Sequence, residues 1–313
     1  LTVDDLRHLP RLTRAEINAN RESMVWRGSP GGKPKPYTTG GSSGEPLHFY
    51  IDAARSAADW AARLRARSWW GIQPGDPEVW IWGAPVEMGC RDWLRRLRDR
   101  LLRQHLLNAF NMSDETVDAY LARIERVQPA CLYGYASSLA LLAGRAIERG
   151  IAPLGDRLHW LETVFTTGEV LLEQDRALIE QVFEVPVAIE YGSRDGGLLA
   201  CGCPDRRLHV PQENVIVEIL DEQGRPVAPG EVGEVTVTYL ETYAMPLIRY
   251  RLGDLARAYG PDDRCPCGRA SQTIAEVRGR VTDQIVCRDE HGTHRMHALA
   301  LIYILREAPG LRQ

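Results

Sequence analysis

Residues 161–195 read LETVFTTGEV LLEQDRALIE QVFEVPVAIE YGSRD, and this stretch decides the fold class. Residues 161–165 and 187–190 are short apolar segments, which predict buried strands. The amphipathic segment 171–183 between them predicts a helix. A helix that connects two strands is typical of parallel pairing, because the chain must cross back over the sheet. The stretch therefore predicts part of an open parallel sheet.

The same alternation extends toward the N-terminus, and a different pattern follows Tyr191. Strands are predicted at 79–82 and 131–133, and helices at 53–70, 91–107, 114–127 and 137–149. Beyond Tyr191 the segments 215–220, 233–239, 247–250, 255–259, 273–277 and 285–287 predict strands, with a last helix at 298–306. We expect an α/β fold: a large domain with a mostly parallel sheet and a β-rich subdomain, followed by the start of a small α+β domain.

The composition narrows the class of protein. The 313 residues are 44% hydrophobic and 26% charged, with a formal net charge of −4. These values are typical of an ordinary globular protein and argue against a dedicated nucleic-acid surface. No run reaches the ~18 apolar residues of a membrane span, and no signal peptide opens the chain. Together with seven cysteines, an odd number, this predicts a reduced, cytoplasmic protein.

Residues 37–46 form a segment rich in Thr, Gly and Ser, YTTGGSSGEP. Glycines let backbone amides converge on an anion, and hydroxyl groups add donors. The segment is not a Walker A loop, because no Gly-Lys-Ser/Thr ends it, and it is not a dinucleotide fingerprint. Taken alone, it is also compatible with a flexible loop.

Three further segments carry carboxylates close to predicted strands. They are Thr166-Thr-Gly-Glu169, Glu190-Tyr-Gly-Ser-Arg-Asp195 and Tyr250-Arg-Leu-Gly-Asp254. Ligands in open α/β sheets bind beyond the carboxyl ends of strands, and Mg²⁺ prefers oxygen ligands. An Asp at a strand end can also accept hydrogen bonds from ribose hydroxyls. The alternative for each carboxylate alone is a helix cap or a turn.

The order of these segments, completed by Gly279-Arg280 and Asp283, resembles the adenylate-forming superfamily of acyl-CoA synthetases, luciferases and peptide-synthetase adenylation domains. Ala244-Met-Pro-Leu-Ile-Arg-Tyr-Arg251 and Cys265-Pro-Cys-Gly-Arg269 are most similar to its phenylacetate-CoA ligase-like branch, which includes CapK-like proteins. The resemblance runs from about residue 9 to the end of the chain.

The resemblance implies an AMP-forming acid ligase. Such an enzyme activates a small carboxylic acid with Mg²⁺ and ATP, giving an acyl-adenylate, and then transfers the acyl group to coenzyme A or another nucleophile. No nucleic-acid partner is implied, and a homodimer is compatible with the family. Residues 1–280 would form the AMP-binding core, and residues 281–313 the hinge, at or beside Asp283, with the beginning of the small domain.

The resemblance also assigns roles to individual positions. The β- and γ-phosphates would bind at Thr38, Thr39, Gly40, Gly41, Ser42, Ser43 and Gly44. The adenine would lie against Gly168 and Glu169, with Tyr191 stacked near it and Gly192 and Ser193 beside it. Asp195 would hold the metal and Asp254 the ribose hydroxyls. Either Arg269 or Arg280 would approach the ribose or phosphate, and Asp195 and Arg280 are the predicted catalytic residues.

Two departures from the family pattern affect the functional prediction. Glu45 stands where the phosphate loop usually has a lysine, and no lysine follows Lys35. The family places a catalytic lysine in its small C-terminal domain, so we expect this sequence to be the core piece of a longer protein. The alternative is a catalytically impaired family member that binds nucleotide in polysaccharide or natural-product assembly. The chain as given is expected to bind ATP better than it turns it over.

Cysteine pairs at 201/203 and 265/267 predict a metal site. The preferred ligands are Cys203, His209, Cys265 and Cys267, a set typical of structural zinc and one that matches the pattern of the branch. Cys201 replaces His209 if the imidazole points away, and the alternative is a group of reduced cysteines without metal.

Aromatic residues flank the predicted strand 79–82 and lie at the end of the predicted strand 131–133. Trp69, Trp70, Trp80 and Trp82 are expected to be mostly core, although some of them could wall an acyl pocket. Tyr133 and Tyr135 are candidates to line the same pocket.

Overall fold

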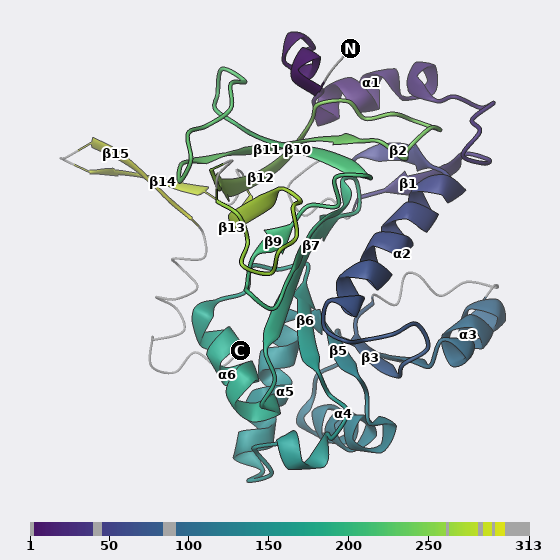
Figure 1. The fold of residues 1–313 in the computed structure, drawn as a ribbon, viewed down its shortest axis with the longest axis vertical. Helices are drawn as coiled ribbons and strands as arrows, with labels where there is room; N and C mark the ends of the chain where they lie inside the picture. The colour runs from purple at the N-terminus through teal and green to yellow at the C-terminus, as the bar shows by residue number, and fades with distance from the viewer. Residues whose placement is uncertain are drawn as a thin grey trace.

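The computed structural model describes residues 3–39, 46–83, 92–260, 263–280, 284–289 and 292–297. An eleven-stranded sheet forms the centre of the molecule (Figure 1). Its strands, in spatial order, are β10 (Val215–Leu220), β11 (Val232–Tyr239), β12 (Tyr250–Ala258), β13 (Thr273–Arg280), β9 (Leu208–His209), β8 (Gly197–Gly202), β7 (Val187–Ser193), β6 (Thr163–Thr167), β5 (Cys131–Tyr135), β3 (Glu78–Ile81) and β4 (Gln104–Leu107).

This sheet has a parallel part and an antiparallel part. Strands β4, β3, β5, β6 and β7 run parallel to one another, and every pairing from β7 to β10 is antiparallel. The α/β class with a large, mixed sheet is confirmed. The β-rich part is continuous with the parallel part, because β8 and β9 join the two through hydrogen bonds.

The helices of the described residues are η1 (Val3–His8), α1 (Arg14–Met24), α2 (Ala53–Ser68), α3 (Asp92–Leu101), α4 (Asp114–Val127), α5 (Ala136–Glu148), η3 (Gly155–Arg157) and α6 (Glu173–Phe183). Two small sheets complete the fold: β1 (Lys35–Thr38) with β2 (His48–Ile51), and β14 (Gln284–Asp289) with β15 (Gly292–His297). The β14–β15 hairpin projects from the body of the molecule (Figure 1). Among the described residues, no helix combines the length and hydropathy that crossing a membrane requires.

The two faces of the parallel half differ in chemistry. Successive side chains of a strand point to opposite faces. Val79, Leu132 and Val164 belong to one apolar core with residues of α4, α5 and α6. The intervening positions carry aromatic and charged side chains, and α2 covers this second face (Figure 1). The second face therefore combines apolar and aromatic side chains with the buried charges of Arg67, Glu78 and Glu190, and charged residues are rarely buried unless they are paired.

The start of α2 is held firmly. Asp52 is buried and caps the helix, because its Oδ1 accepts a hydrogen bond from the Arg55 backbone N–H at 3.0 Å. Its Oδ2 accepts from the backbone N–H groups of Tyr243 and Ala244 at 3.0 and 2.7 Å. One carboxylate thus fixes α2 against the loop that precedes β12.

Two predicted elements were wrong in part. The helix predicted at 91–107 ends as α3 at Leu101, and β4 follows, because Arg103 adopts a φ of +52° that no right-handed helix accommodates. The strand predicted at 247–250 begins only at Tyr250, because Arg249 has a φ of +50°. The predicted helix 298–306 and the predicted hinge residue Asp283 lie outside the described residues.

Candidate active site

A cleft of about 1580 Å³ lies over the carboxyl ends of the parallel strands. Residues that follow four of these strands line it: Gly83 after β3, Ser137 after β5, Gly168 after β6 and Arg194 after β7. The ends of neighbouring parallel strands are the usual ligand site of an open α/β sheet. Residues of β12 and β13 close the cleft from the antiparallel half.

Asp254 receives two partners from neighbouring elements. The Tyr191 hydroxyl donates a hydrogen bond to its Oδ2 at 2.8 Å, and the Arg280 Nε lies 3.8 Å from its Oδ1. Asp254 and Arg280 are direct register partners on β12 and β13. Burial, together with the charge of Asp254, raises the pKa of Tyr191 well above its ordinary value, which keeps the phenol as a donor. Asp254 lies within β12, whereas the sequence predicted a strand end.

Gly168 and Glu169 shape the cleft beyond β6. Gly168 has a φ of +74°, and a Cβ at this position would lie 2.9 Å from the Tyr135 ring. The Glu169 carboxylate accepts hydrogen bonds from the Ser137 backbone N–H and hydroxyl at 2.9 and 3.1 Å. Glu169 thereby caps α5, whose own N-cap residue makes no side-chain cap. The capping alternative for this carboxylate is thus observed.

Asp195 is only 5% exposed and lies beyond β7. Its Oδ2 accepts a hydrogen bond from the Tyr250 hydroxyl at 2.7 Å, and the nearest Arg14 guanidinium nitrogen is 3.7 Å away. The Arg55 guanidinium donates to its backbone carbonyl at 2.9 Å. Burial and the Asp195 charge raise the pKa of Tyr250, so this phenol also stays protonated. The Asp195 carboxylate is therefore held in place at the cleft by Tyr250.

Gly192 and Ser193 are the last two residues of β7, directly before the turn to β8. A Cβ on Gly192 would lie 2.8 Å from the Gly197 carbonyl oxygen, so only glycine fits this close approach. The Ser193 hydroxyl accepts a hydrogen bond from the Gly196 N–H at 2.7 Å. Both residues line the cleft, and both belong to β7, which extends three residues beyond the predicted strand.

The two threonines at the start of the Gly/Ser segment differ in position. Thr39 lines the cleft, and its backbone N–H and its hydroxyl hold the two ends of the segment together through Leu47. Thr38 is exposed and belongs to β1; it is not among the residues that line the cleft. Gly40, Gly41, Ser42, Ser43 and Gly44 lie outside the described residues.

The two candidate arginines are far from equivalent. Arg280 lines the cleft beside Asp254. The Arg269 guanidinium lies 4.6 Å from the centre of the Trp69 ring, next to the cysteine cluster, and Arg269 is not among the residues that line the cleft. Of the two, only Arg280 is among the residues that line the cleft.

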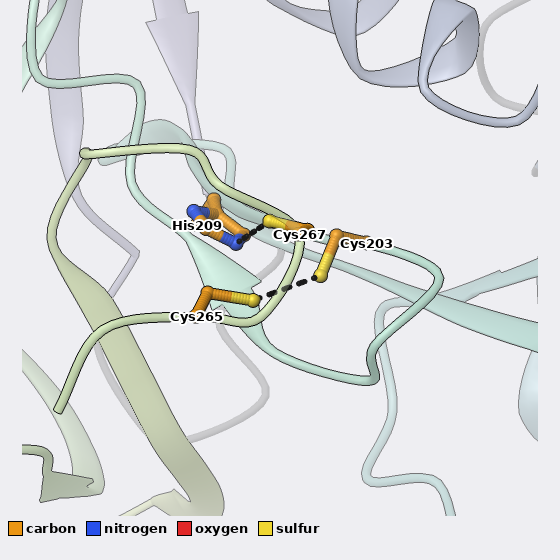
Figure 2. Close-up of side chains that lie close together, drawn as sticks. All are labelled: Cys203, His209, Cys265 and Cys267. Atoms are coloured by element: carbon orange, nitrogen blue, oxygen red, sulfur yellow. Dashed lines mark hydrogen bonds between the residues drawn. The ribbon is translucent and has the colours of Figure 1, made fainter.

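Cys203, His209, Cys265 and Cys267 come together at one point (Figure 2). Their ligand atoms all lie within 4.8 Å of one another. The sulfurs of Cys203 and Cys265 are 3.6 Å apart, and the Cys267 sulfur is 3.3 Å from the His209 Nε2. A tetrahedral zinc with bonds of roughly 2.0–2.3 Å needs ligand atoms separated by roughly 3.5–3.8 Å, and the separations of 3.6 and 3.3 Å lie close to this range.

The surroundings of this cluster orient the imidazole. The other ring nitrogen of His209, Nδ1, lies 2.9 Å from the Ser271 hydroxyl, which fixes the ring as outer partners of metal-binding histidines do. Cys201 does not join the group; it is buried in a small core with residues of α2. His209, rather than Cys201, is therefore the residue that joins the three cysteines, an alternative that the sequence left open.

A buried ion cluster beneath the cleft was not predicted. Glu190, only 3% exposed, pairs with Arg63 through both carboxylate oxygens at 2.8–3.1 Å. The Tyr133 hydroxyl donates to the same carboxylate at 2.9 Å. Burial tends to raise the pKa of Glu190, but Arg63, followed by Arg67 and Tyr133, lowers it to about 2. No local sequence pattern predicts the Arg63–Glu190 pair, because its members are separated by 127 positions in the chain.

Comparison with known proteins agrees with this architecture. CapK from Staphylococcus aureus is 24% identical over 261 residues, which are 81% of this chain and 54% of that protein. Phenylacetate-coenzyme A ligase from Thermus thermophilus is 29% identical over 164 residues, 51% of this chain and 35% of that protein. No protein-family model matches the sequence.

A solved structure of 2-hydroxyisobutyryl-CoA ligase, in complex with 2-HIB-AMP and CoA, superimposes with a TM-score of 0.70 at 22% identity. The alignment covers 98% of this chain and 71% of that protein. The chain has the fold of the adenylate-forming enzymes. The resemblance inferred from the order of the motifs is thereby confirmed. The chain spans about half the length of CapK and about a third of phenylacetate-coenzyme A ligase.

Proposed function

We propose that this chain binds ATP in the cleft and activates a carboxylic acid. A carboxylate oxygen of the acid forms a bond to the α-phosphorus, the bond from that phosphorus to the bridging oxygen breaks, and pyrophosphate leaves with the electron pair. In a second step coenzyme A or another nucleophile attacks the acyl carbon, AMP leaves, and the nucleophile gives up its proton. Catalysis of this kind rests on positioning and charge neutralisation.

The group of Asp254, Tyr191 and Arg280 is the single observation that carries the proposal. A buried phenol and a guanidinium hold the Asp254 carboxylate at the cleft, where it can accept hydrogen bonds from both ribose hydroxyls. Gly168 also lines the cleft, where the Tyr135 and Trp82 rings pack close to its backbone, and an adenine ring would lie against this segment. Asp254, its two partners and Gly168 all line the cleft and would fix the nucleoside.

Asp195 fits a Mg²⁺ ion as one of several ligands. Mg²⁺ usually takes one or two carboxylates and completes its shell with phosphate oxygens and water. The Asp195 carboxylate accepts a hydrogen bond from Tyr250, and Asp195 lines the cleft. Mg²⁺ would neutralise phosphate charge there, while Arg14, 3.7 Å from the same carboxylate, adds a second positive charge.

A zinc ion would occupy the Cys203, His209, Cys265 and Cys267 cluster. Four protein donors leave no open coordination position, so its role would be structural. The site joins the β8–β9 turn to the segment before β13, and zinc would fix these two segments beneath the cleft.

One observation favours a second candidate function. No lysine follows Lys35, and the cations that line the described cleft are all arginines. Arginine binds phosphate well but is rarely the mobile group of an adenylation reaction. A chain that binds ATP without turning it over, in support of a polysaccharide or natural-product pathway, would have this composition.

Exchange of labelled pyrophosphate into ATP, measured with a panel of aryl and alkyl acids, distinguishes the two functions. Exchange that depends on one acid class supports the ligase. ATP binding by calorimetry without exchange for any acid supports the second function and contradicts the first. The absence of ATP binding would contradict both.

A further inference from the structure

An ion cluster of two arginines and two glutamates lies between α2 and the sheet. Arg63 and Arg67 stand one turn apart on α2. Arg67 donates from Nε to Glu78 at 2.9 Å and from Nη1 to Glu190 at 3.4 Å. Arg63 binds Glu190 through Nε and Nη2. Glu78 also accepts a hydrogen bond from the Trp80 indole at 2.6 Å.

The cluster is electrically neutral and its charges are fixed. Burial opposes the charge on Arg63, but Glu190 raises the pKa of this guanidinium above its ordinary value. Glu190 has a pKa of about 2 and stays ionised at neutral pH. The two positive charges therefore balance the two negative ones. A further buried charge placed against the cluster would have no counter-ion, which is costly in a low-dielectric site.

One nitrogen of the Arg63 guanidinium is not used by the cluster. Its Nη1 forms no hydrogen bond with any described residue, whereas its Nε and Nη2 are both used by Glu190. The Arg63 side chain is 22% exposed and lines the cleft, in contrast to Arg67, which is 2% exposed. Glu190, by contrast, already accepts from Arg63, Arg67 and Tyr133. The cluster thus offers the cleft a donor rather than an acceptor.

Aromatic rings surround this donor. The Arg63 guanidinium lies 5.8 Å from the ring centres of Trp60, Trp80 and Tyr133, which all line the cleft. Farther along the same face, the rings of Trp82 and Tyr135 stack at 4.3 Å with an angle of 20° between them. Flat rings of this kind are suited to hold another flat ring. The wall continues to Gly168, where the nucleoside would begin.

We propose that this wall selects an aryl acid whose ring carries a neutral hydrogen-bond acceptor, such as an ether, hydroxyl or carbonyl oxygen, bound by Arg63. The inference rests on the proposed acid activation. The ring lies against Trp80, Tyr133 and Trp82, its carboxylate points to the nucleotide side of the cleft, and its oxygen accepts from the Arg63 Nη1. A second carboxylate in place of the neutral oxygen is disfavoured by the balanced charges.

Matched benzoates test the selection in the full chain. Pyrophosphate exchange and calorimetric binding in the presence of AMP are measured for benzoate, its 3- and 4-methoxy and 3- and 4-hydroxy derivatives, terephthalate and hexanoate. A hydrogen bond to a charged donor is worth about 1.5–3 kcal/mol, so we expect at least one methoxybenzoate to exceed benzoate about 10- to 100-fold in kcat/KM and in affinity. Methoxy groups only accept, so a preference confined to hydroxyl derivatives would indicate donation to Glu190 and overturn the proposal.

The paired variant Arg63→Met with Glu190→Met removes the ion pair without leaving a buried charge alone. We expect it to bind ATP like the unchanged protein and to treat methoxybenzoate and benzoate alike within about threefold. Arg65→Met is the control, because Arg65 lies on the exposed side of α2 and pairs with Glu213; it should keep the full preference.

The outcomes separate this inference from the proposed function. Exchange that is strongest with hexanoate, benzoate or terephthalate, or a methoxy preference that persists in the paired variant, overturns the inference and leaves the ligase standing. ATP binding without exchange for any acid overturns the ligase, and calorimetric binding then decides the selectivity by itself. If the paired variant does not fold, the benzoate series on the unchanged chain remains decisive.

Discussion

The surroundings of Asp254 are set by the register of β12 and β13 and by the approach of β7. Asp254 lies opposite Arg280 on the neighbouring strand, and Tyr191 reaches it from β7. Three elements must be in place before this carboxylate faces the cleft. A sequence motif can name the aspartate, but only the paired strands supply the guanidinium and the phenol that hold it.

Asp254→Ala is expected to weaken ATP binding about 10- to 100-fold, because two hydrogen bonds to the ribose hydroxyls are lost. The unchanged protein should bind ATP better than 2′,3′-dideoxy-ATP by a similar factor, and the variant should bind both alike. Calorimetry measures all four affinities. Asp221→Ala, in the exposed turn after β10, is the control and should not change them. Equal affinity of the unchanged protein for the two nucleotides would contradict the ribose assignment.

Glu190 should make the free energy of unfolding depend on pH between its folded-state pKa and its ordinary pKa. Its pKa is about 2 in the folded chain, below the ordinary value of 4.5. A lowered folded-state pKa contributes stability that is fully present above pH ~4.5 and is lost as the pH falls toward 2. Between pH 5 and 3, the Tm of the unchanged protein should fall at least about 2 °C further than that of the Arg63→Met, Glu190→Met variant. Thermal unfolding of both proteins checks this, and parallel curves would contradict it.

The strand β9 is the shortest strand of the large sheet. β9 has two residues, and its neighbours are joined to it by few hydrogen bonds. The cysteine–histidine cluster lies at this weak point. A metal ion there would supply the fixation that so short a strand cannot.

We expect one zinc per chain in protein purified without chelator. Cys265→Ser and Cys267→Ser should lose it and lower the Tm by at least about 5 °C, because structural zinc contributes several kcal/mol to folding. Cys201→Ala is the control: Cys201 lies on β8 but outside the cluster, so this variant should keep its zinc. Plasma mass spectrometry gives the content. Zinc-free protein with an unchanged Tm on chelation would exclude the site.

Helix α2 carries Arg63 of the proposed acyl wall, and Asp52 holds the start of this helix. Asp52→Ala removes the cap and leaves the buried N–H groups of Tyr243 and Ala244 without a partner, at a cost of about 3–5 kcal/mol. Ser113→Ala, at the exposed cap of α4, should cost only about 1 kcal/mol. Urea unfolding compares the two. Similar losses would show that Asp52 does no more than an ordinary cap.

The parts of the molecule that sequence could predict are those with local signals. Ser113 and the 3.6-residue period gave α4 with its observed bounds, and the alternation at 215–220 gave β10. β8 was missed because all six of its residues are buried and glycines flank it, so it shows no alternation. The cluster of Arg63 and Glu190 was missed because the pair forms only when α2 lies across β7. The Arg63–Glu190 cluster depends on contacts between residues far apart in the sequence, and local propensity does not encode such contacts.

Near residue 280 the large sheet gives way to a separate hairpin, and shortening the chain at this point tests what the hairpin contributes. β13 ends the large sheet at Arg280, and β14 and β15 pair with each other in a sheet of their own. A chain shortened to residues 1–280 should therefore unfold within a few degrees of the full chain and bind ATP within about threefold, because the cleft walls remain intact. Turnover, if present in the full chain, should fall much more than binding, since a hinge acts after the nucleotide is bound. Thermal unfolding, calorimetry and exchange on both chains measure the three quantities. Loss of ATP binding on truncation would place part of the nucleotide site beyond Arg280.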